Sequence, residues 1–228
     1  MNKEKQNAPQ NVYDIYYSNP ESRLRIEDIV TNIEEIPSSG KSGLLLYGVY
    51  GTGKTTLANL LPDAIEKGKA GVGLNSPETF IGCQQGFNGP QVMTLIGNIL
   101  NVMSFNSSGL HYIILDEVDN LTKLAQQSLK SAMNTHRAVF ILTTNNISEL
   151  DKGLKDRCVL IEMNAGAPEE YLPLAKEIAQ NKNVFLNDEI LLEAISLANG
   201  SFRNLSHGLN RLVRRAESSK ITMGKGAL

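Results

Sequence analysis

The residues of this chain best suited to chemistry form a glycine-rich segment that ends in lysine and threonine. Residues 48–55 read Gly-Val-Tyr-Gly-Thr-Gly-Lys-Thr, between an apolar run at 43–47 and an apolar segment at 57–61. A strand entering such a loop and a helix leaving it let backbone N–H groups and the helix N-terminus surround a polyphosphate. A lysine then reaches the outer phosphates and a hydroxyl binds magnesium. The segment predicts a nucleoside triphosphate site made of Gly48, Gly51, Thr52, Gly53, Lys54, Thr55 and Thr56.

A second candidate group follows the apolar stretch 112–115. Asp116 and Glu117 come directly after it, and Asn145 follows the next apolar stretch. Ligands of open α/β sheets bind at the carboxyl ends of the strands. Asp116 suits a magnesium site, Glu117 suits activation of the attacking water, and Asn145 suits contact with the γ-phosphate or that water. The pattern therefore predicts hydrolysis as well as binding. The alternatives are a solvated acidic turn at 116–119 and an asparagine that only forms a turn.

Composition narrows the class of protein. The chain has 228 residues, 41% hydrophobic residues and a net charge of −2, which is typical of a globular chain of one or two domains. Two cysteines and three histidines provide neither a disulfide framework nor zinc-ligand spacing. Residues 1–11 are polar and no apolar run reaches membrane-spanning length, so we expect no signal peptide, no membrane contact and a cytoplasmic location. After residue 200 the chain has six basic residues and one acidic residue. These basic residues either form a solvated helix face or contact phosphates.

Helical and strand patterns alternate as in a parallel sheet with crossover helices. The expected strands are 43–47, 79–82, 112–115, 138–142 and 159–163. A capping box at Ser18 and Glu21 begins a helix with Ile26, Ile29, Val30 and Ile33 on one face, and another helix runs from Asn88 to about Met103. Only helices follow, at 169–180, 188–198 and 203–218. We expect a doubly wound, five-stranded α/β domain at 1–163 and a small all-helical domain at 164–228.

Three motifs carry a family resemblance. Residues 116–129, Asp-Glu-Val-Asp-Asn-Leu-Thr-Lys-Leu-Ala-Gln-Gln-Ser-Leu, closely resemble the Asp-Glu-Ala-Asp…Thr-x-x-Ala-Gln-x-Ala-Leu stretch of the AAA+ sliding-clamp-loader ATPases. This group includes replication factor C small subunits and bacterial and phage clamp-loader motors. Residues 140–145 look like its sensor 1 strand, and 156–158 are similar to its Ser-Arg-Cys motif. The resemblance covers roughly residues 12–212.

The resemblance implies roles for individual residues. The loop 48–55 corresponds to Walker A, Asp116 and Glu117 to Walker B, and Asn145 to sensor 1. Arg157 would be a finger in the neighbouring subunit's site, and Arg203, in a segment similar to the Gly-Asp-x-Arg motif, would be sensor 2. The alternatives are a surface ion pair and a helix-surface charge. Ile15 and Tyr16 would lie at the adenine base, although the Tyr-Arg-Pro signature of that segment is missing. The implied cofactors are ATP and Mg²⁺.

The implied function is that of an ATP-hydrolysing motor that loads a ring-shaped clamp onto primed DNA. Its implied partners are other AAA+ subunits, the sliding clamp and the DNA. Asp156 and Ser201 replace serine and aspartate of the family motifs. No counterpart of the family's C-terminal helical collar follows the lid, so we expect either a trimmed collar or a compact phage- or plasmid-type relative. The alternatives are an AAA+ ATPase of helicase loading, transposition or defence, and a regulatory module with little turnover.

A helix after Thr122 offers a route from DNA to hydrolysis. Gln126, Gln127 and Lys130 fall at neighbouring positions on successive turns, directly after the acidic pair. In a ring of subunits such helices could line a channel, with Lys130 contacting the DNA backbone. The alternative is that these side chains pack against the next subunit or face solvent.

Overall fold

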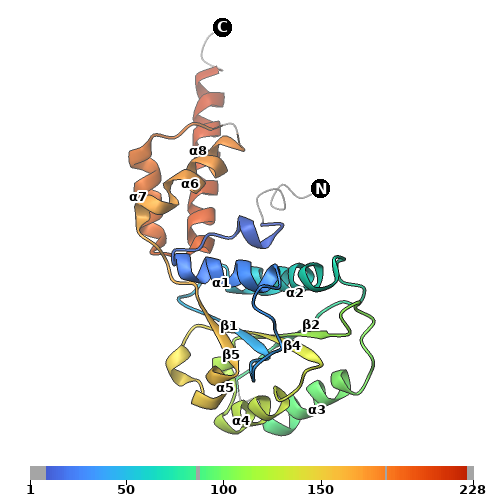
Figure 1. Ribbon diagram of the computed structural model, residues 1–228. Coiled ribbons are helices and arrows are strands. Elements are labelled where there is room, and N and C mark those ends of the chain that lie inside the picture. Colours follow the sequence, from blue (N-terminus) through green and yellow to red (C-terminus); the bar gives the residue numbers. More distant parts are fainter. Residues whose placement is uncertain (1–8, 86–87, 183, 225–228) are drawn as a thin grey trace. The chain divides into compact units, whose positions relative to one another are not determined.

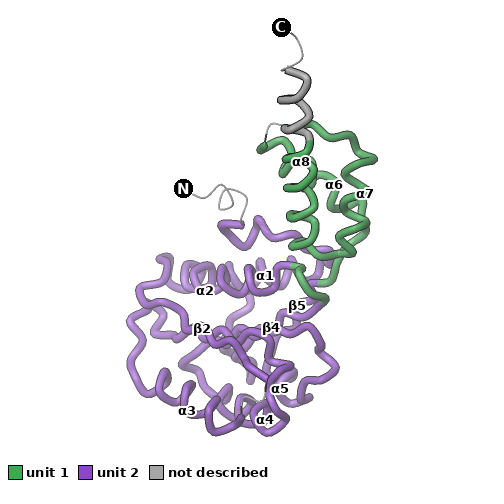
Figure 2. The backbone as a smooth tube through the Cα atoms, turned by 180° about the vertical axis from the view of Figure 1, so that it is seen from behind, with its two compact units in different colours: residues 1–8, 49–52, 164–228 green, residues 9–48, 53–163 purple. Residues whose placement is uncertain are grey.

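The computed structural model describes residues 9–85, 88–182 and 184–224. The chain divides into two compact units (Figure 2). We call them the sheet unit, whose described residues lie in 9–48 and 53–163, and the helical unit, whose described residues lie in 49–52 and 164–224. The tip of the glycine-rich loop thus groups with the helical unit, whereas we expected it within 1–163. The predicted domain limits stay a prediction.

A five-stranded parallel sheet forms the centre of the sheet unit (Figure 1). Its strands follow the order β2-β3-β4-β1-β5. The strands are β1 (Gly43–Tyr47), β2 (Thr79–Gly82), β3 (His111–Asp116), β4 (Ala138–Thr144) and β5 (Cys158–Glu162). All seven residues of the central β4 are buried, as expected for a parallel strand covered on both faces. The predicted fold class is confirmed, with strand limits that differ by one or two residues.

Helices cover both faces of this sheet (Figure 1). On one face lie α1 (Pro20–Val30) and α2 (Lys54–Ala70); on the other lie α3 (Gly89–Leu100), α4 (Lys123–Ala132) and the short α5 (Lys152–Asp156). Short 3₁₀ helices occur at η2 (Val12–Asp14), η3 (Val118–Asn120) and η4 (Ile147–Glu149).

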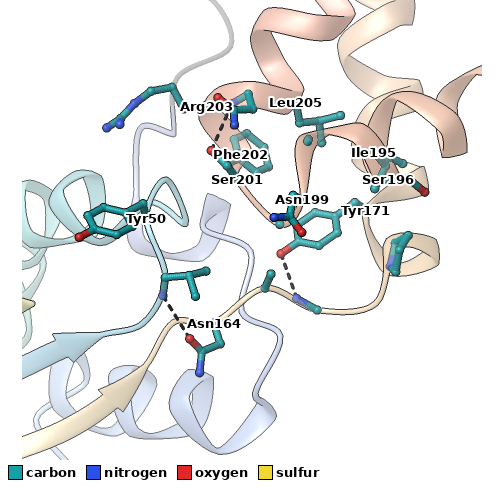
Figure 3. Close-up of a pocket in the computed structure, with 17 residues that line it drawn as sticks. Tyr50, Asn164, Tyr171, Ile195, Ser196, Asn199, Ser201, Phe202, Arg203 and Leu205 are labelled. Carbon is teal, nitrogen blue, oxygen red and sulfur yellow. Dashed lines mark hydrogen bonds between the residues drawn. The ribbon is translucent and has the colours of Figure 1, made fainter. Parts of the chain in front are cut away.

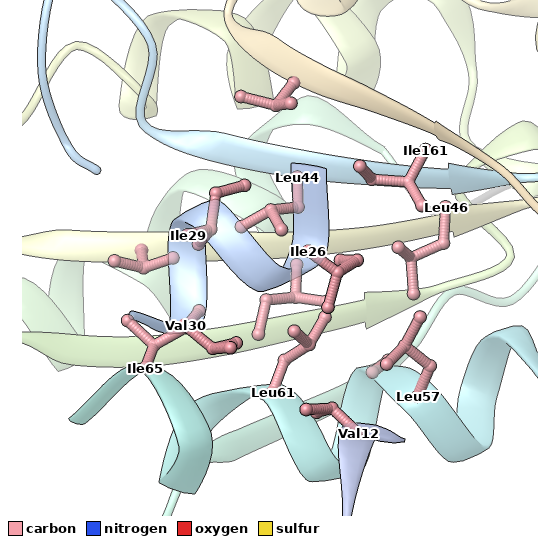
Figure 4. Packing of buried hydrophobic residues seen from close by; sticks show 14 of the residues in the cluster. Val12, Ile26, Ile29, Val30, Leu44, Leu46, Leu57, Leu61, Ile65 and Ile161 are labelled. Carbon is pink, nitrogen blue, oxygen red and sulfur yellow. The ribbon is translucent and has the colours of Figure 1, made fainter. Parts of the chain in front are cut away.

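The two-residue period of the strands divides the core into two clusters. Leu44 and Leu46 point to the α1 and α2 side, where they join Ile26 and Leu57 (Figure 4). Leu45 points to the opposite side and packs with apolar residues of α3, α4 and α5. Because β1 is anchored on both faces, the loop that follows it leaves from a fixed point.

Two helix limits differ from those expected. Asn19 is the N-cap of α1, with its side chain accepting from Glu21 N at 3.0 Å, so the predicted capping box at Ser18 is wrong. Pro20 takes the first helical position, which makes the residue before it the cap. Helix α1 ends at Val30, and Ile33 beyond it is 77% exposed. Helix α3 begins where it was expected, with Asn88 as its N-cap, but ends at Leu100, before Met103.

The helical unit contains η5 (Pro168–Tyr171), α6 (Leu172–Gln180), α7 (Asp188–Ala198) and α8 (Phe202–Gly224). Apolar residues at helical spacing are buried where α7 packs on α6 and α8, among them Leu191, Ile195, Leu205 and Leu209. Among the described residues, no helix combines the length and the apolar character needed to cross a membrane.

Candidate functional site

Two glycines give the phosphate-loop segment its shape. Gly51 and Gly53 have φ of +78° and +93°, a left-handed conformation that is costly for residues with a Cβ. Gly53 is the N-cap of α2, and Lys54 is the first residue of the helix. The Lys54 ammonium donates to the Gly48 carbonyl at 3.0 Å and is buried. Thr55 and Thr56 lie exposed in the first turn of α2.

The sheet register brings the predicted polar residues to one edge. Tyr47 at the end of β1 pairs with Thr144 of β4, and Gly82 of β2 pairs with Asp116 of β3. All these strands are parallel, so Gly48, Asp116 and Asn145 follow them at the same carboxyl edge. Asn145 is half-buried there. This is the edge at which ligands of open α/β sheets bind.

A pair of hydroxyl groups fixes the Asp116 carboxylate. Thr55 Oγ1 donates to Asp116 Oδ1 at 2.9 Å, and Thr143 Oγ1 donates to the same oxygen at 2.6 Å. The two predicted magnesium ligands, Thr55 and Asp116, are therefore in contact. Thr143 is 1% exposed, and we did not predict a role for it. Its only sequence signal was its place at the end of an apolar strand.

The donor set fits Mg²⁺ bound together with a nucleotide. Thr55 and Asp116 supply a hydroxyl and a carboxylate, the hard oxygen ligands that this ion prefers. Within the described residues, no group of three or more His, Cys, Asp or Glu side chains could hold a metal ion. An ion at Asp116 would thus complete its shell with phosphate oxygens and water, as Mg²⁺ does in nucleotide sites.

Glu117 has an unusual backbone conformation. Its φ of 59° and ψ of 53° are left-handed, which for a residue with a Cβ is a strained conformation often associated with function. The Glu117 N–H donates to Thr143 Oγ1 at 2.9 Å, and its exposed side chain accepts from Asn120 Nδ2 at 3.2 Å. The carboxylate is thus held at the edge of the sheet beside Asp116. Asn120 is a second contact that the motifs did not reveal.

A pocket of about 810 Å³ lies in the helical unit (Figure 3). Val49 N–H donates to Asn164 Oδ1 at 3.2 Å, and Phe202 N–H donates to the Gly51 carbonyl at 2.8 Å, so the loop tip is tied to this unit. The rings of Tyr171 and Phe202 are 6.5 Å apart between centroids. Lining residues that the figure labels include Tyr50, Asn164, Tyr171, Ile195, Phe202 and Arg203.

Comparison with known proteins identifies the family. Residues 44–164 match the ATPase family associated with various cellular activities (AAA). This chain belongs to the AAA family. It is 28% identical over 202 residues to replication factor C small subunit 2 of Pyrobaculum islandicum, covering 86% of this chain and 61% of that protein. It is 28% identical over 188 residues to replication factor C subunit 4 of Encephalitozoon cuniculi, covering 78% of this chain and 58% of that protein. The chain thus spans about three fifths of these relatives.

Solved structures have the same fold. The RuvB Holliday junction branch migration motor of Thermotoga maritima gives a TM-score of 0.66 at 17% identity, over 95% of this chain and 67% of that chain. A DNA polymerase III gamma subunit-related protein of the same organism gives a TM-score of 0.54 at 18% identity, over 81% of this chain and 57% of that chain. At these identities the similarity concerns the AAA fold alone.

The candidate sensor 2 residue, Arg203, lies in the first turn of α8, and the residue before that helix differs from the family motif. Ser201 Oγ accepts from Asn204 N at 3.3 Å, so Ser201 caps α8, a position for which serine and aspartate are similarly suited. Arg203 is exposed in the first turn of α8 and lines the pocket (Figure 3). A Cβ at Gly51 would lie 2.2 Å from Ser201 Oγ, so the loop tip tolerates only glycine here.

The candidate finger of this AAA chain lies at the opposite edge of its own sheet. Ser42 N and Gly43 N, at the start of β1, donate to the Arg157 carbonyl at 3.1 and 3.2 Å. Asp116 ends β3, and a strand of five residues spans roughly 17 Å. Arg157 is therefore not brought together with Asp116. Its guanidinium donates to Asn134 Oδ1 at 2.9 Å and to the Gly153 carbonyl at 3.0 Å.

The structure also places the residues predicted to contact DNA and those predicted to contact the adenine base. Gln126 is 1% exposed: it accepts from Asp151 N at 2.8 Å and donates to the Leu121 carbonyl at 3.3 Å, so its predicted outward position is wrong. Lys130 Nζ lies 3.7 Å from Asp151 Oδ1 with 31% of its side chain exposed. Ile15 is buried in the core and Tyr16 is half-buried. A role for these last two at the adenine base stays a prediction.

Proposed function

We propose that this chain is an ATP-hydrolysing motor subunit of a sliding-clamp loader that acts in DNA replication. The main support is the contact of Thr55 with Asp116 beside Glu117, in a chain of the AAA family. The similarity to replication factor C small subunits favours clamp loading among the activities of this family. For such a replication role we propose a cytoplasmic location.

The proposed reaction uses residues of the carboxyl edge. The backbone N–H groups of 48–55 and the Lys54 ammonium bind the polyphosphate of ATP. Mg²⁺, when bound through Thr55 and Asp116, neutralises charge on the phosphates. Glu117 orients a water and accepts its proton as that water attacks the γ-phosphorus. The bond from the γ-phosphorus to the β,γ-bridging oxygen breaks and ADP leaves, while Asn145 holds the water or the γ-phosphate.

The pocket of the helical unit is a second proposed contact surface for the nucleotide, beside the prediction for Ile15 and Tyr16. Tyr171 and Phe202 offer aromatic surface, and the Asn164 side chain already accepts from the loop at Val49. Arg203, which lines this pocket, is the proposed sensor 2. The measurable consequence is that Arg203→Ala weakens ATP affinity, whereas truncation of an exposed arginine on α1, Arg23→Ala, leaves it unchanged.

Neighbouring subunits complete the proposed site. Arg157 would neutralise charge on the phosphoryl group bound by the next AAA+ subunit, because a guanidinium stabilises the charge that develops there. Hydrolysis would then require assembly. The proposed partners are other AAA+ subunits, the ring-shaped clamp and primed DNA.

The decisive experiment measures steady-state ATP hydrolysis with the natural partner subunits present, with and without primed DNA and the cognate clamp. We expect the two together to raise the rate several-fold, and the Glu117→Gln protein to stay inactive in every condition. A rate that responds to DNA but not to the clamp would favour another DNA transaction. A rate indifferent to both would contradict the clamp-loader proposal.

A further inference from the structure

We propose that Asn120 is a positioning residue for the Glu117 carboxylate. The inference rests on the proposed ATPase function, because it concerns the group that activates water, and it adds a residue and a structural connection to that site.

The Asn120 amide joins two different parts of the sheet unit. Its Nδ2 donates to Glu117 Oε2 at 3.2 Å and to the Cys83 carbonyl at 3.2 Å. A side-chain amide nitrogen carries two hydrogens, so both bonds can exist at the same time. One bond holds the carboxylate and the other holds the amide itself.

The local backbone explains why residue 120 reaches residue 117. The Asn120 N–H donates to the Glu117 carbonyl at 3.0 Å and closes the 3₁₀ helix η3. The left-handed backbone of Glu117 begins this turn, and the turn brings the Asn120 amide within hydrogen-bond distance of the Glu117 carboxylate.

The Cys83 carbonyl is a fixed anchor for this amide. Cys83 directly follows β2, is 4% exposed, and its N–H donates to the Asp116 carbonyl at 2.9 Å. Both backbone groups of Cys83 are thus paired with the acidic segment. The orientation of Glu117 is thereby connected to the end of β2.

A neutral donor is well suited to this position. Asp116, Glu117 and Asp119 bring three carboxylates into one short segment, and like charges at close range repel. Glu117 is exposed and has several rotatable bonds, so without a partner its carboxylate would occupy many orientations. A hydrogen bond from Asn120 selects one of them without adding a charge that would compete for Mg²⁺ or phosphate.

The test compares Asn120→Ala and Asn120→Asp with a control. In assembled protein with its partner subunits, we expect Asn120→Ala to lower kcat about tenfold and leave KM and the Kd for ATP within twofold. Asn120→Asp keeps the shape but replaces the donor with a negative charge, so kcat should fall at least as far. The control is Asn75→Ala, which removes the hydrogen bond that another asparagine amide, an exposed one, donates to Ser107 Oγ. It should leave kcat unchanged.

A double-variant cycle separates positioning from general damage. Glu117→Asp keeps a carboxylate but withdraws it from the reach of Asn120, so adding Asn120→Ala should lower kcat less than twofold further. A full tenfold further loss would overturn the proposal, as would an unchanged or raised kcat in Asn120→Ala. A raised Kd for ATP or a lowered Tm that accounts for the lost activity would also overturn it.

The same set of variants distinguishes this proposal from the function on which it rests. If Glu117→Gln hydrolysed ATP at the normal rate, the proposed role of Glu117 would fail. If Glu117→Gln were inactive and Asn120→Ala were normal, only the role of Asn120 would fail.

Discussion

The Thr143 hydroxyl donates to Asp116 Oδ1 at 2.6 Å and accepts from Glu117 N–H at 2.9 Å. A single buried side chain of β4 thus sets the positions of both acidic residues at the end of β3. The carboxylate proposed to bind Mg²⁺ and the carboxylate proposed to activate water share one support.

Replacing Thr143 with valine removes the hydroxyl and keeps the size of the side chain, so it should damage the site through the lost hydrogen bonds. We expect Thr143→Val to weaken the affinity for ATP in the presence of Mg²⁺ about tenfold, because Asp116 loses a hydrogen bond to its charged oxygen. Equilibrium titration with labelled ATP measures the effect. Thr143→Ser keeps the hydroxyl and should remain within about threefold of the wild type. Equal losses in both variants would show that packing, not the hydroxyl, matters.

The proposed roles of Lys54 and Glu117 predict opposite defects. Lys54→Ala should abolish tight ATP binding, because the ammonium faces phosphate charge. Glu117→Gln should bind ATP normally and hydrolyse it at least about a hundredfold more slowly, because only the proton acceptor is lost. Binding is measured by titration and turnover by phosphate release. Loss of affinity as complete in Glu117→Gln as in Lys54→Ala would contradict this division.

Arg157 is predicted to act only between subunits. We expect Arg157→Ala to bind ATP normally but to hydrolyse it on the order of a thousandfold more slowly, even at high protein concentration. Mixing it with Glu117→Gln protein should restore part of the activity, since one intact composite site can then form.

The control for Arg157 is Asn134→Ala. This substitution removes the acceptor of the Arg157 Nε–H and leaves the guanidinium in place. It should lower Tm about as much as Arg157→Ala does and retain most of the turnover. Failure to recover activity in co-assembled mixtures would indicate that Arg157 acts within its own chain or not at all.

The buried thiol of Cys158 predicts a dependence of stability on alkaline pH. Burial raises the pKa of Cys158 from 9.0 to about 12, partly offset by Lys41 and Arg157. In the unfolded chain the thiol ionises near its ordinary pKa, so the folded state loses relative stability as the pH rises from about 9 towards 12.

We expect the free energy of unfolding to fall by about 1.3 kcal/mol more between pH 8 and pH 10 in the wild type than in Cys158→Ala. Denaturant titrations at the two pH values measure this difference. Every other titrating group is present in both proteins, so its contribution cancels when the two are compared. Parallel pH profiles for the two proteins would contradict the prediction.

The sequence predicted those features that repeat or lie close together along the chain. Leu44, Leu45 and Leu46 are apolar on successive positions, so a strand covered on both faces was the simplest interpretation. Because carboxyl ends of parallel strands meet at one edge, Thr55 and Asp116 could each be assigned to a magnesium site there, and the structure brings the two into contact.

Features that depend on a distant partner could not be predicted in this way. The Gln126 amide is buried because Asp151 N, 25 positions away, donates to it, and a polar side chain on a helix otherwise indicates an outward face. Thr143 is a common type of strand residue, and nothing in the sequence indicated that its hydroxyl contacts Asp116 and Glu117. No motif marked Tyr171 or Phe202, and only the fold of the helical unit places them at a pocket.

The position of Arg157 at the edge opposite Asp116 affects how many complete ATP sites an assembly of these chains can have. If each site is completed by the chain next to it, contacts between copies are head-to-tail, and such contacts either close into a ring or continue as an open arc. A ring of n chains has n complete sites, whereas an open arc of n chains has only n − 1. In an open arc, one terminal subunit would bind ATP that it cannot hydrolyse, and another would donate an arginine to no neighbour.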